Sequence, residues 1–261
     1  MLLARYAPID STRYEKLTQA AKAFDKINEW LPAQLFAFWT IFVAGMANGK
    51  AQTDRFYFWD WNGWLIGLIG IIIITLIIGF LGNKQRYIPI NNISASFKSI
   101  WYHLALSYVF FGVGYLLFTT ISIINAILYV IAYLAVYLIH SIKVEKSERI
   151  IILQNEKNVK TGISIVLLTF SGIISYVIED PVLSTASIVS LPFLVVLLFG
   201  RDLRHLERAK FYPIFIFAMF VVSREAWFLI PLLLLFFILR SYNYLRYQKV
   251  YPTFGVTDDQ N

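Results

Sequence analysis

The chain has 261 residues, of which 58% are hydrophobic and 15% are charged, and its formal net charge is +7. Soluble domains carry roughly 25% charged residues, so the composition excludes that class and indicates a polytopic integral membrane protein. Cysteine is absent, which excludes disulfides, thiolate catalysis and cysteine-ligated iron–sulfur clusters. The positive charge follows the expected membrane topology, and nucleic acid is not expected as a partner.

The apolar stretches are continuous and lack the alternating pattern of a β-barrel. We therefore expect an all-α bundle, since a helix satisfies its own backbone hydrogen bonds in lipid. The first ten residues lack the apolar core and cleavage site of a signal peptide. The first spanning helix is accordingly expected to direct insertion.

Residues 1–32 are predicted to form an amphipathic segment at the inner membrane surface. Thr12 and Glu15 have the spacing of a capping box, and Pro32 is expected to end a helix over 12–31. Its apolar residues recur at helical intervals and its lysines mostly face away from them. The apolar set is Tyr14, Leu17, Ala21, Phe24, Ile27 and Leu31.

A transmembrane bundle is predicted over residues 33–241, followed by an aromatic and basic interfacial tail at 242–261. We expect eight spans, of which the seventh is short for a full crossing. They are placed at 33–49, 63–82, 99–118, 120–141, 161–178, 182–200, 211–223 and 225–241.

The basic residues predict the orientation of these spans. With the N-terminus inside, 20 of the 23 Lys and Arg residues fall on inner segments. The outer segments hold the remaining three together with five acids, so both termini are expected on the cytoplasmic side. The outer residues are Lys50, Arg55, Arg224, Asp54, Asp60, Glu179, Asp180 and Glu225.

The first outer loop, residues 55–64, is the richest aromatic cluster in the chain. Tryptophan and tyrosine prefer the headgroup level, so an interfacial belt is expected there. A docking surface for a partner subunit and an outer lid are the competing interpretations.

Few polar or ionisable side chains fall within the spans. His103 and His140 lie near inner ends and Asn125 lies deeper, and we expect them to make satisfied polar contacts. Because no acid lies mid-span, a transporter is a less favoured interpretation. Pro192 and Pro231 are candidates for helix kinks, and Gly112 with Gly114 permits close packing of the third span.

A block of charge at 200–210 separates spans six and seven. As a helix it would place arginines and a histidine on one face, which suits a phosphate or diphosphate, while lipid headgroups and topology explain the same residues. Asp202 with His205 and Arg204 with Glu207 also have the spacing of local ion pairs. The basic face consists of Arg201, Arg204, His205 and Arg208.

The loop after span two begins with Asn83 and holds no aspartate, whereas the loop after span six offers Asp202 and Glu207, five residues apart. In layout, with an amphipathic lead-in and these two loops facing one another, the chain resembles the UbiA superfamily of intramembrane prenyltransferases. That family carries N-D-x-x-D-x-x-x-D and D-x-x-x-D motifs on the two loops, which hold magnesium against an isoprenyl diphosphate, and usually has nine spans. The resemblance implies a lipid-lined cavity, and the missing aspartates imply the loss of the metal site.

We therefore expect a non-catalytic, UbiA-like protein of the bacterial inner membrane that binds an isoprenoid or quinone-type lipid in an intramembrane cavity, without a metal. The alternatives are an accessory subunit of a larger membrane complex, and an active prenyltransferase with a rearranged magnesium site. Asp202 and Glu207 are the catalytic candidates of that last alternative. The expected ligand-binding residues are Asn83, Lys84, Arg86, Arg201, Arg204, His205 and Arg208.

Overall fold

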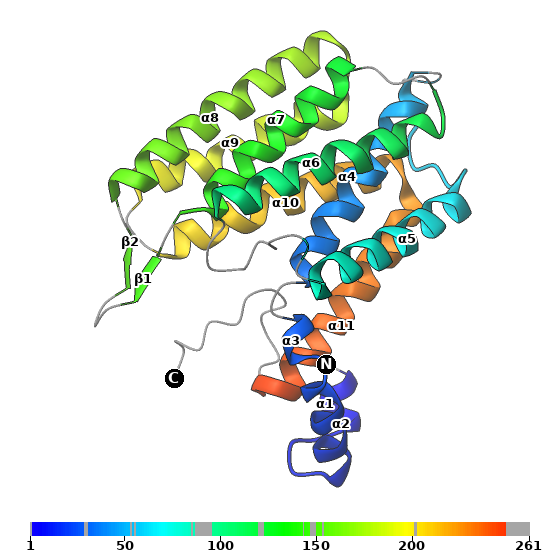
Figure 1. Cartoon of the computed structure of the whole chain (residues 1–261), viewed down its shortest axis with the longest axis vertical. Helices are drawn as coiled ribbons and strands as arrows, with labels where there is room; N and C mark the ends of the chain where they lie inside the picture. Colours follow the sequence, from blue (N-terminus) through cyan, green and yellow to red (C-terminus); the bar gives the residue numbers. More distant parts are fainter. Residues whose placement is uncertain are drawn as a thin grey trace. The chain divides into compact units, whose positions relative to one another are not determined.

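A computed structural model describes residues 2–28, 31–52, 54, 56–84, 86, 96–119, 123–142, 144–146, 150–152, 154–200 and 203–248. Nearly all of them are helical, and one short β hairpin interrupts the helices (Figure 1). The chain divides into two compact units, one formed by residues 1–32 with 229–261 and the other by residues 33–228.

Five described stretches are long and apolar enough to cross a membrane, which confirms a helical, multi-pass membrane protein. Three other helices, α6 (Phe97–Leu116), α7 (Ile123–His140) and α10 (Leu203–Arg224), occupy the remaining predicted positions. The five stretches are α4 (Leu31–Ala51), α5 (Trp64–Asn83), Asn155–Val177 within α8 (Gln154–Val177), α9 (Pro181–Phe199) and Ala226–Tyr247, which joins the 3₁₀ turn Ala226–Phe228 to α11 (Leu229–Tyr247).

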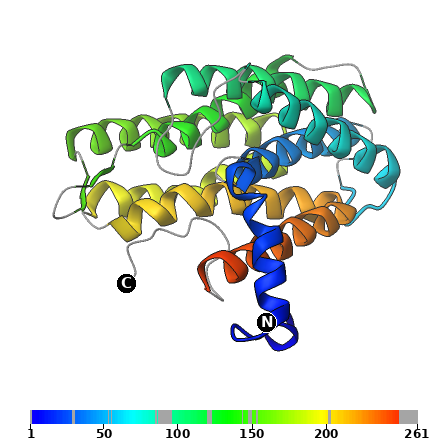
Figure 2. The ribbon, with the colours of Figure 1, turned by 60° about the horizontal axis from the view of Figure 1, so that its bottom comes forward.

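In the unit of residues 33–228, α4 runs through the middle and is buried along nearly its whole length (Figures 1 and 2). It packs on α6 through glycines: a Cβ added at Gly45 would lie 2.2 Å from the Phe111 carbonyl oxygen, and one at Gly114 would lie 2.2 Å from that of Phe42. The close packing predicted for Gly114 is therefore confirmed. In contrast, α5 turns most of its apolar side chains outward, as expected of a helix that faces lipid.

Helices α7 to α10 form a bundle in which each helix packs on the next and α10 closes against α7. Small residues line the contact between α8 and α9, where Gly172 lies against Ser187 and Ser184. Asp180 begins α9 as its N-cap, since its side chain accepts hydrogen bonds from the backbone N–H groups of Val182 and Leu183.

The structure departs from the predicted elements between α7 and α8. Strands β1 (Val144–Lys146) and β2 (Ile150–Ile152) pair antiparallel, with Val144 opposite Ile152. Helix α8 begins at Gln154, seven residues before the predicted span, because its first charges are satisfied within the protein. Lys160 pairs with Glu156 one turn away and also donates to the Ser141 carbonyl oxygen at the end of α7.

The charged block before span seven is also different from the expected loop. From Leu203 onward it is the beginning of α10 and continues without a break to Arg224. Pro213 lies inside this helix, and Pro192 lies inside α9. Pro231 lies in the first turn of α11, where a missing backbone N–H removes no helical hydrogen bond.

The other unit joins the N-terminal segment to the end of α11. The predicted helix over 12–31 is divided into α2 (Thr12–Lys22) and α3 (Asp25–Asn28), and α1 (Leu2–Tyr6) precedes them. Ser11, and not Thr12, is the N-cap of α2, because its hydroxyl accepts the backbone N–H of Tyr14. Pro32 is the second residue of α4, in its first turn, and does not end the helix before it.

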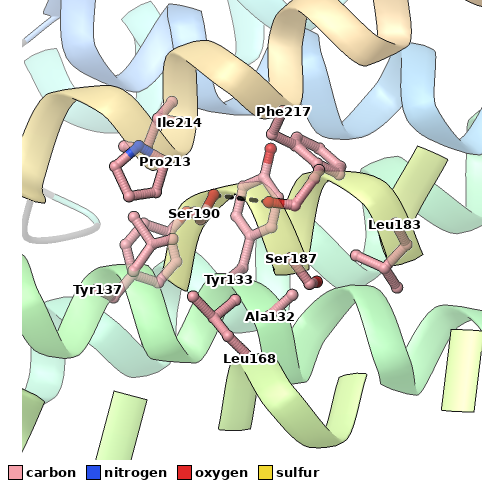
Figure 3. Close-up of a pocket in the computed structure, with 12 residues that line it drawn as sticks. Ala132, Tyr133, Tyr137, Leu168, Leu183, Ser187, Ser190, Pro213, Ile214 and Phe217 are labelled. Atoms are coloured by element: carbon pink, nitrogen blue, oxygen red, sulfur yellow. Dashed lines mark hydrogen bonds between the residues drawn. The ribbon is translucent and has the colours of Figure 1, made fainter. Parts of the chain in front are cut away.

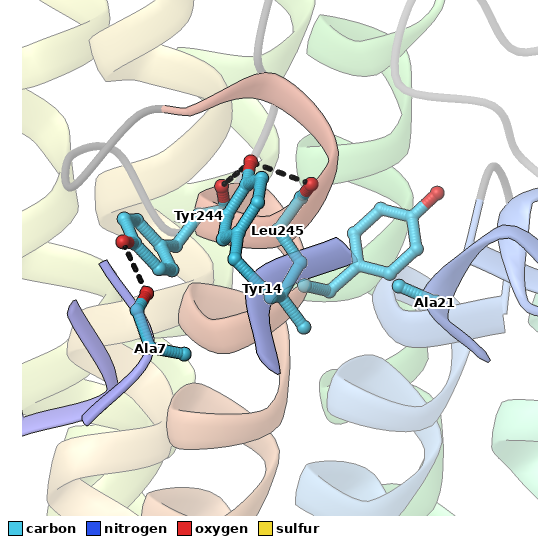
Figure 4. Packing of buried hydrophobic residues seen from close by; sticks show 6 residues of the cluster. Ala7, Tyr14, Ala21, Tyr244 and Leu245 are labelled. Carbon is cyan, nitrogen blue, oxygen red and sulfur yellow. Dashed lines mark hydrogen bonds between the residues drawn. The ribbon is translucent and has the colours of Figure 1, made fainter. Parts of the chain in front are cut away.

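Within this unit α2 packs along the last turns of α11 (Figure 4). The Tyr14 hydroxyl donates to the carbonyl oxygens of Tyr244 and Leu245, at 3.3 and 3.0 Å, and the Tyr244 hydroxyl donates to that of Ala7. Asp25 accepts two hydrogen bonds from Arg246, at 2.7 and 2.6 Å. These contacts hold the N-terminal segment against the C-terminal end of α11.

Candidate functional site

The first turns of α10 present two arginines to the outside. Leu206 and Ala209 are buried, which orients the helix, while Arg204, Glu207 and Arg208 are exposed. Arg204 and Arg208 are four residues apart and therefore lie one above the other on the same face. Arg201 and Asp202, which were predicted to belong to this site, lie outside the described residues.

Neither arginine forms an ion pair with any described residue, so the local pair expected between Arg204 and Glu207 is not formed. Glu207 acts electrostatically on Lys210. His205 is only half exposed, and its ring packs against Gly200, where an added Cβ would meet it at 2.6 Å. The two arginine guanidinium groups are thus available to an external anion.

An aromatic strip continues along α10 from the arginines. Phe211 and Phe215 are 37% and 38% exposed, and their rings stack with centroids 5.4 Å apart. They follow Arg204 by seven and eleven residues, so they lie on its face of the helix, roughly 10 and 16 Å further along the axis. We call Arg204, Arg208, Phe211 and Phe215 the α10 strip: two cations followed by an apolar surface.

Other basic groups at this end of the helices contact the protein itself. The Lys157 ammonium donates to the carbonyl oxygens of Leu198 and Gly200 at the end of α9. The His140 imidazole is hydrogen-bonded to the Lys210 carbonyl oxygen at 3.1 Å. Cationic groups at a helix C-terminus stabilise its unsatisfied carbonyls, so Lys157 and Lys160 have a structural role.

The residues predicted after span two lie elsewhere. Asn83 ends α5, Lys84 and Arg86 follow it, and all three are exposed. The Arg86 guanidinium lies over the Phe80 ring, 5.3 Å from its centroid. Figures 1 and 2 both draw the end of α5 apart from the beginning of α10, so the structure does not gather the two predicted groups around one point.

A second polar site, which the sequence analysis missed, lies at the opposite ends of the helices. Lys50, near the end of α4, contacts two carboxylates: Asp60 at 3.0 Å and Glu225 at 2.8 Å. Glu225 is completely buried and also accepts a hydrogen bond of 2.8 Å from the Trp227 indole. Tyr57 donates to the same carboxylate, at 3.3 Å. We call Lys50, Tyr57, Asp60, Glu225 and Trp227 the Lys50 cluster.

The pKa values in the Lys50 cluster follow these contacts. Burial raises the pKa of the Glu225 carboxyl, although Lys50 opposes this shift. Partial burial also disfavours ionisation of Asp60, but the Asn62 backbone N–H and the Lys50 ammonium outweigh it and lower the pKa of that carboxyl. In the sequence these charges indicate topology. The signal for the cluster is that Asp60 lies between two tryptophans, in Trp59-Asp60-Trp61, and that Glu225 lies two residues before one, in Glu225-Ala226-Trp227.

A chain of amides extends from Asp180. Its carboxylate accepts a hydrogen bond of 2.7 Å from the Asn48 amide, whose oxygen accepts one of 2.9 Å from Asn125. Burial raises the pKa of Asp180. The predicted polar contact of Asn125 is therefore present and joins the beginnings of α7 and α9 to α4.

His103 is buried between helices and makes the polar contact expected for it. Its imidazole Nδ1 lies 3.3 Å from the Tyr137 hydroxyl, and the ring stacks on Phe38 with centroids 4.8 Å apart. The described residues contain no group of three or more histidine, aspartate or glutamate side chains suited to a metal.

A small cavity lies between α7, α8, α9 and α10 (Figure 3). Its volume is about 30 Å³, and Tyr133, Leu168, Ser187 and Phe217 are among the residues that line it. Sites that enclose a small-molecule ligand typically measure roughly 300–1,000 Å³. This cavity is far smaller than an isoprenoid chain requires.

Comparison of the chain with models of protein families, with curated proteins and with solved structures finds no match.

Proposed function

We propose that this multi-pass membrane protein binds a lipid with a phosphate or diphosphate headgroup on the α10 strip. The observation that carries the proposal is the exposure of Arg204 and Arg208, without an ion pair among the described residues, directly before the exposed rings of Phe211 and Phe215.

The side chains of the strip complement both parts of such a lipid, the headgroup and the chain. Guanidinium groups bind phosphate oxygens through paired, charge-assisted hydrogen bonds, and the N-terminus of a helix adds a favourable dipole for an anion. The two phenylalanine rings lie one to three turns deeper along the helix, where the acyl or prenyl chain of a lipid would begin. A quinone has no phosphate, so the strip favours a phosphorylated isoprenoid over a quinone-type ligand.

The topology that we propose is eight spans with both termini in the cytoplasm. The contact of α2 with the last turns of α11 supports it, because two segments that touch lie on the same side of a membrane. An even number of crossings follows from that contact, and the concentration of Lys and Arg on the same side supports a cytoplasmic location. The bacterial inner membrane stays a prediction from the sequence alone.

An isoprenyl phosphate is proposed as the ligand class from the sequence resemblance to the UbiA superfamily alone, since the described ends of the two loops that carry this resemblance do not lie together. The cavity of about 30 Å³ favours binding on the lipid-facing side of α10 over binding in an enclosed chamber. The alternative, an active prenyltransferase, needs oxygen ligands for magnesium, and among the described residues of this site Glu207, which is exposed between the two arginines, could supply one. A magnesium-dependent transfer assay tests this alternative.

Native mass spectrometry of the purified protein, titrated with farnesyl diphosphate and separately with farnesol, tests the proposal. We expect the diphosphate to bind more tightly than the alcohol, and the double variant Arg204→Gln, Arg208→Gln to lose about tenfold or more in affinity, since hydrogen bonds between charged groups contribute roughly 1.5–3 kcal/mol each.

The matched control is Arg5→Gln, Arg13→Gln, which removes two exposed arginines from the N-terminal segment. We expect its affinity to equal that of the unmodified protein. Equal binding of farnesol and farnesyl diphosphate, or equal affinity of the two double variants, contradicts the proposal.

A further inference from the structure

The loop between α4 and α5 (Figure 1) carries several large aromatic side chains that are about half exposed or more. Phe56 is 83% exposed, Phe58 67%, Trp59 50% and Trp61 48%. Contact of these rings with water is unfavourable. A group of exposed rings on a loop with a fixed conformation therefore marks a surface that a membrane or a partner covers.

The loop is held in place by the Lys50 cluster and by backbone hydrogen bonds. The Trp59 and Asp60 N–H groups donate to the carbonyl oxygens of Ser223 and Arg224, both at 2.9 Å, and the Ala226 N–H donates to that of Asp60 at 3.0 Å. Asp60 is thus fixed through its backbone on both sides and through its carboxylate to Lys50.

Trp59 adopts a left-handed backbone conformation, with φ of 55°. A residue with a bulky side chain is rarely found there, and the conformation costs roughly 1–3 kcal/mol unless surrounding contacts impose it. The backbone bonds to α10 are the contacts that impose it here. The loop is therefore preorganised, with its aromatic side chains directed outward.

The charges of this loop determine which surface it fits. The described cations at this end face inward: Lys50 binds Asp60 and Glu225, and Arg224 donates to the Tyr57 carbonyl oxygen. The exposed described charges are acidic, Asp54 and Glu179. The described part of this surface therefore offers no exposed cation to anionic lipids, and it suits a zwitterionic headgroup layer.

The aromatic surface is continuous with a lipid-facing helix. Trp64 begins α5 and is 48% exposed, and the outward residues of α5 that follow are aliphatic, including Leu65, Ile72 and Leu76 at 57%, 58% and 68% exposure. Because α5 is a candidate span, the loop lies where that span meets the membrane surface.

We propose that residues 56–64 form a preformed anchor that inserts into the zwitterionic headgroup layer of the bilayer, with the Lys50 cluster as its positioning device. The partner is the lipid surface itself. This inference is independent of the α10 strip, since the two surfaces lie at opposite ends of the helices and differ in charge.

The absence of cysteine allows a direct depth measurement, because one introduced cysteine is the only site of labelling. Phe58→Cys and Trp61→Cys variants are spin-labelled, reconstituted into palmitoyl-oleoyl phosphatidylcholine vesicles, and examined by electron paramagnetic resonance for collision with oxygen and with a water-soluble nickel chelate. Leu76→Cys on α5 serves as the reference within lipid, and Glu179→Cys at the same end as the aqueous reference.

We expect the oxygen-to-nickel accessibility ratio at positions 58 and 61 to lie between those at 76 and 179, and to stay unchanged when 30% phosphatidylglycerol or 0.5 M salt is added. A ratio equal to that of position 179 overturns the proposal, as does a marked dependence on salt. Spin–spin broadening at position 58 that disappears on mixing with unlabelled protein also overturns it, because a second copy of the chain would then cover the loop.

The role of the Lys50 cluster is tested by adding Glu225→Gln to Phe58→Cys. We expect greater mobility of the label and a wider spread of depths, while circular dichroism shows the same helix content. Unchanged mobility in a folded variant overturns the positioning role of the cluster and leaves the depth result at positions 58 and 61 to decide the anchor itself.

Discussion

Among single side chains, Lys50 combines burial with charge. It is a nearly buried cation between two carboxylates, and it also donates to the Asn62 carbonyl oxygen at 2.6 Å. Removing one partner of a buried ion pair leaves an uncompensated charge, which costs far more than the net contribution of the pair.

We therefore expect Lys50→Met to lower the free energy of unfolding by about 3–5 kcal/mol at neutral pH, because Glu225 is left buried without its cation. Lys50→Met combined with Glu225→Gln is expected to be less destabilised than Lys50→Met alone. Unfolding in mixed micelles with increasing dodecyl sulfate, followed by circular dichroism, measures both values.

The same variant has a defined pH dependence. Burial raises the pKa of Glu225 above its ordinary value, so the folded state takes up a proton at a pH where the unfolded chain does not. Loss of Lys50, which opposes this shift, raises the pKa of Glu225 further, so the destabilisation of Lys50→Met is expected to be largest above that pKa and to decrease as the pH falls through it. A loss of stability that is constant between pH 8 and pH 5 would show that Glu225 is not the unpaired group.

Asp25 gives the opposite dependence. Its hydrogen bonds with Arg246, and then with Tyr242, lower the pKa of its carboxyl from the ordinary 3.8. Its contribution to the docking of α2 and α3 on α11 is thus present above that ordinary value and is lost as the pH falls through the lowered pKa.

Hydrogen exchange of the amides of residues 12–28, corrected for intrinsic rates, tests this contribution. We expect Asp25→Asn to exchange faster than the unmodified protein at pH 5 and above, and the two to converge at lower pH. Asp10→Asn, which changes an exposed acid of the same segment, serves as the control and should have no effect. Equal protection of Asp25→Asn and the unmodified protein at pH 6 would rule out a role for this ion pair.

At the scale of elements, the contact between α4 and α6 depends on the lack of side chains at Gly45 and Gly114. An added Cβ at Gly114 would meet the backbone of Phe42, and backbone cannot move aside without displacing the helix. We expect Gly114→Ala to lower stability by about 1–3 kcal/mol through overpacking.

Gly79→Ala is the matched control for Gly114→Ala. An added Cβ at position 79 of α5 meets nothing within 4 Å, so this change is expected to be neutral or to stabilise by about 0.5–1 kcal/mol through the lower conformational entropy of the unfolded chain. Thermal unfolding followed by intrinsic tryptophan fluorescence compares the two. A melting temperature of Gly114→Ala equal to that of Gly79→Ala would refute the close α4–α6 contact.

The positions of the helices were predictable because each apolar run is long and few charges interrupt it. Their ends were not, since they depend on tertiary contacts. Lys157 and Lys160 belong to α8, and not to a loop, because they reach carbonyl oxygens at the ends of α9 and α7. The short pairing of β1 with β2 leaves no clear trace in the sequence.

The candidate sites also differ in whether they could be predicted from local sequence or depend on tertiary contacts. Arg204 and Arg208 were predicted from their helical spacing, which is a local property. The Lys50 cluster joins residues 50, 60 and 225, and only the fold brings them together. A charge count assigned them correctly to one group of segments, but it could not distinguish a charge in water from one buried against a tryptophan.

At the scale of the whole molecule, the residues 33–228 unit has two chemically different ends. At one end the described cations are paired internally, and aromatic rings and two acids are exposed; at the other end Arg204 and Arg208 are exposed beside the partly exposed Phe211 and Phe215. We therefore expect the aromatic end to contact the membrane surface without attracting anionic lipids, and the arginine end to bind an anionic headgroup. Binding at the arginine end is accordingly expected to weaken with added salt.

Lipid binding on the α10 strip is tested most directly by native mass spectrometry of the lipid retained when the protein is purified from membranes in mild detergent. We expect the unmodified protein and Arg5→Gln, Arg13→Gln to retain a phosphorus-containing lipid, and Arg204→Gln, Arg208→Gln to have lost most of it. Equal occupancy of that lipid in all three proteins would contradict the assignment of the α10 strip as its binding site.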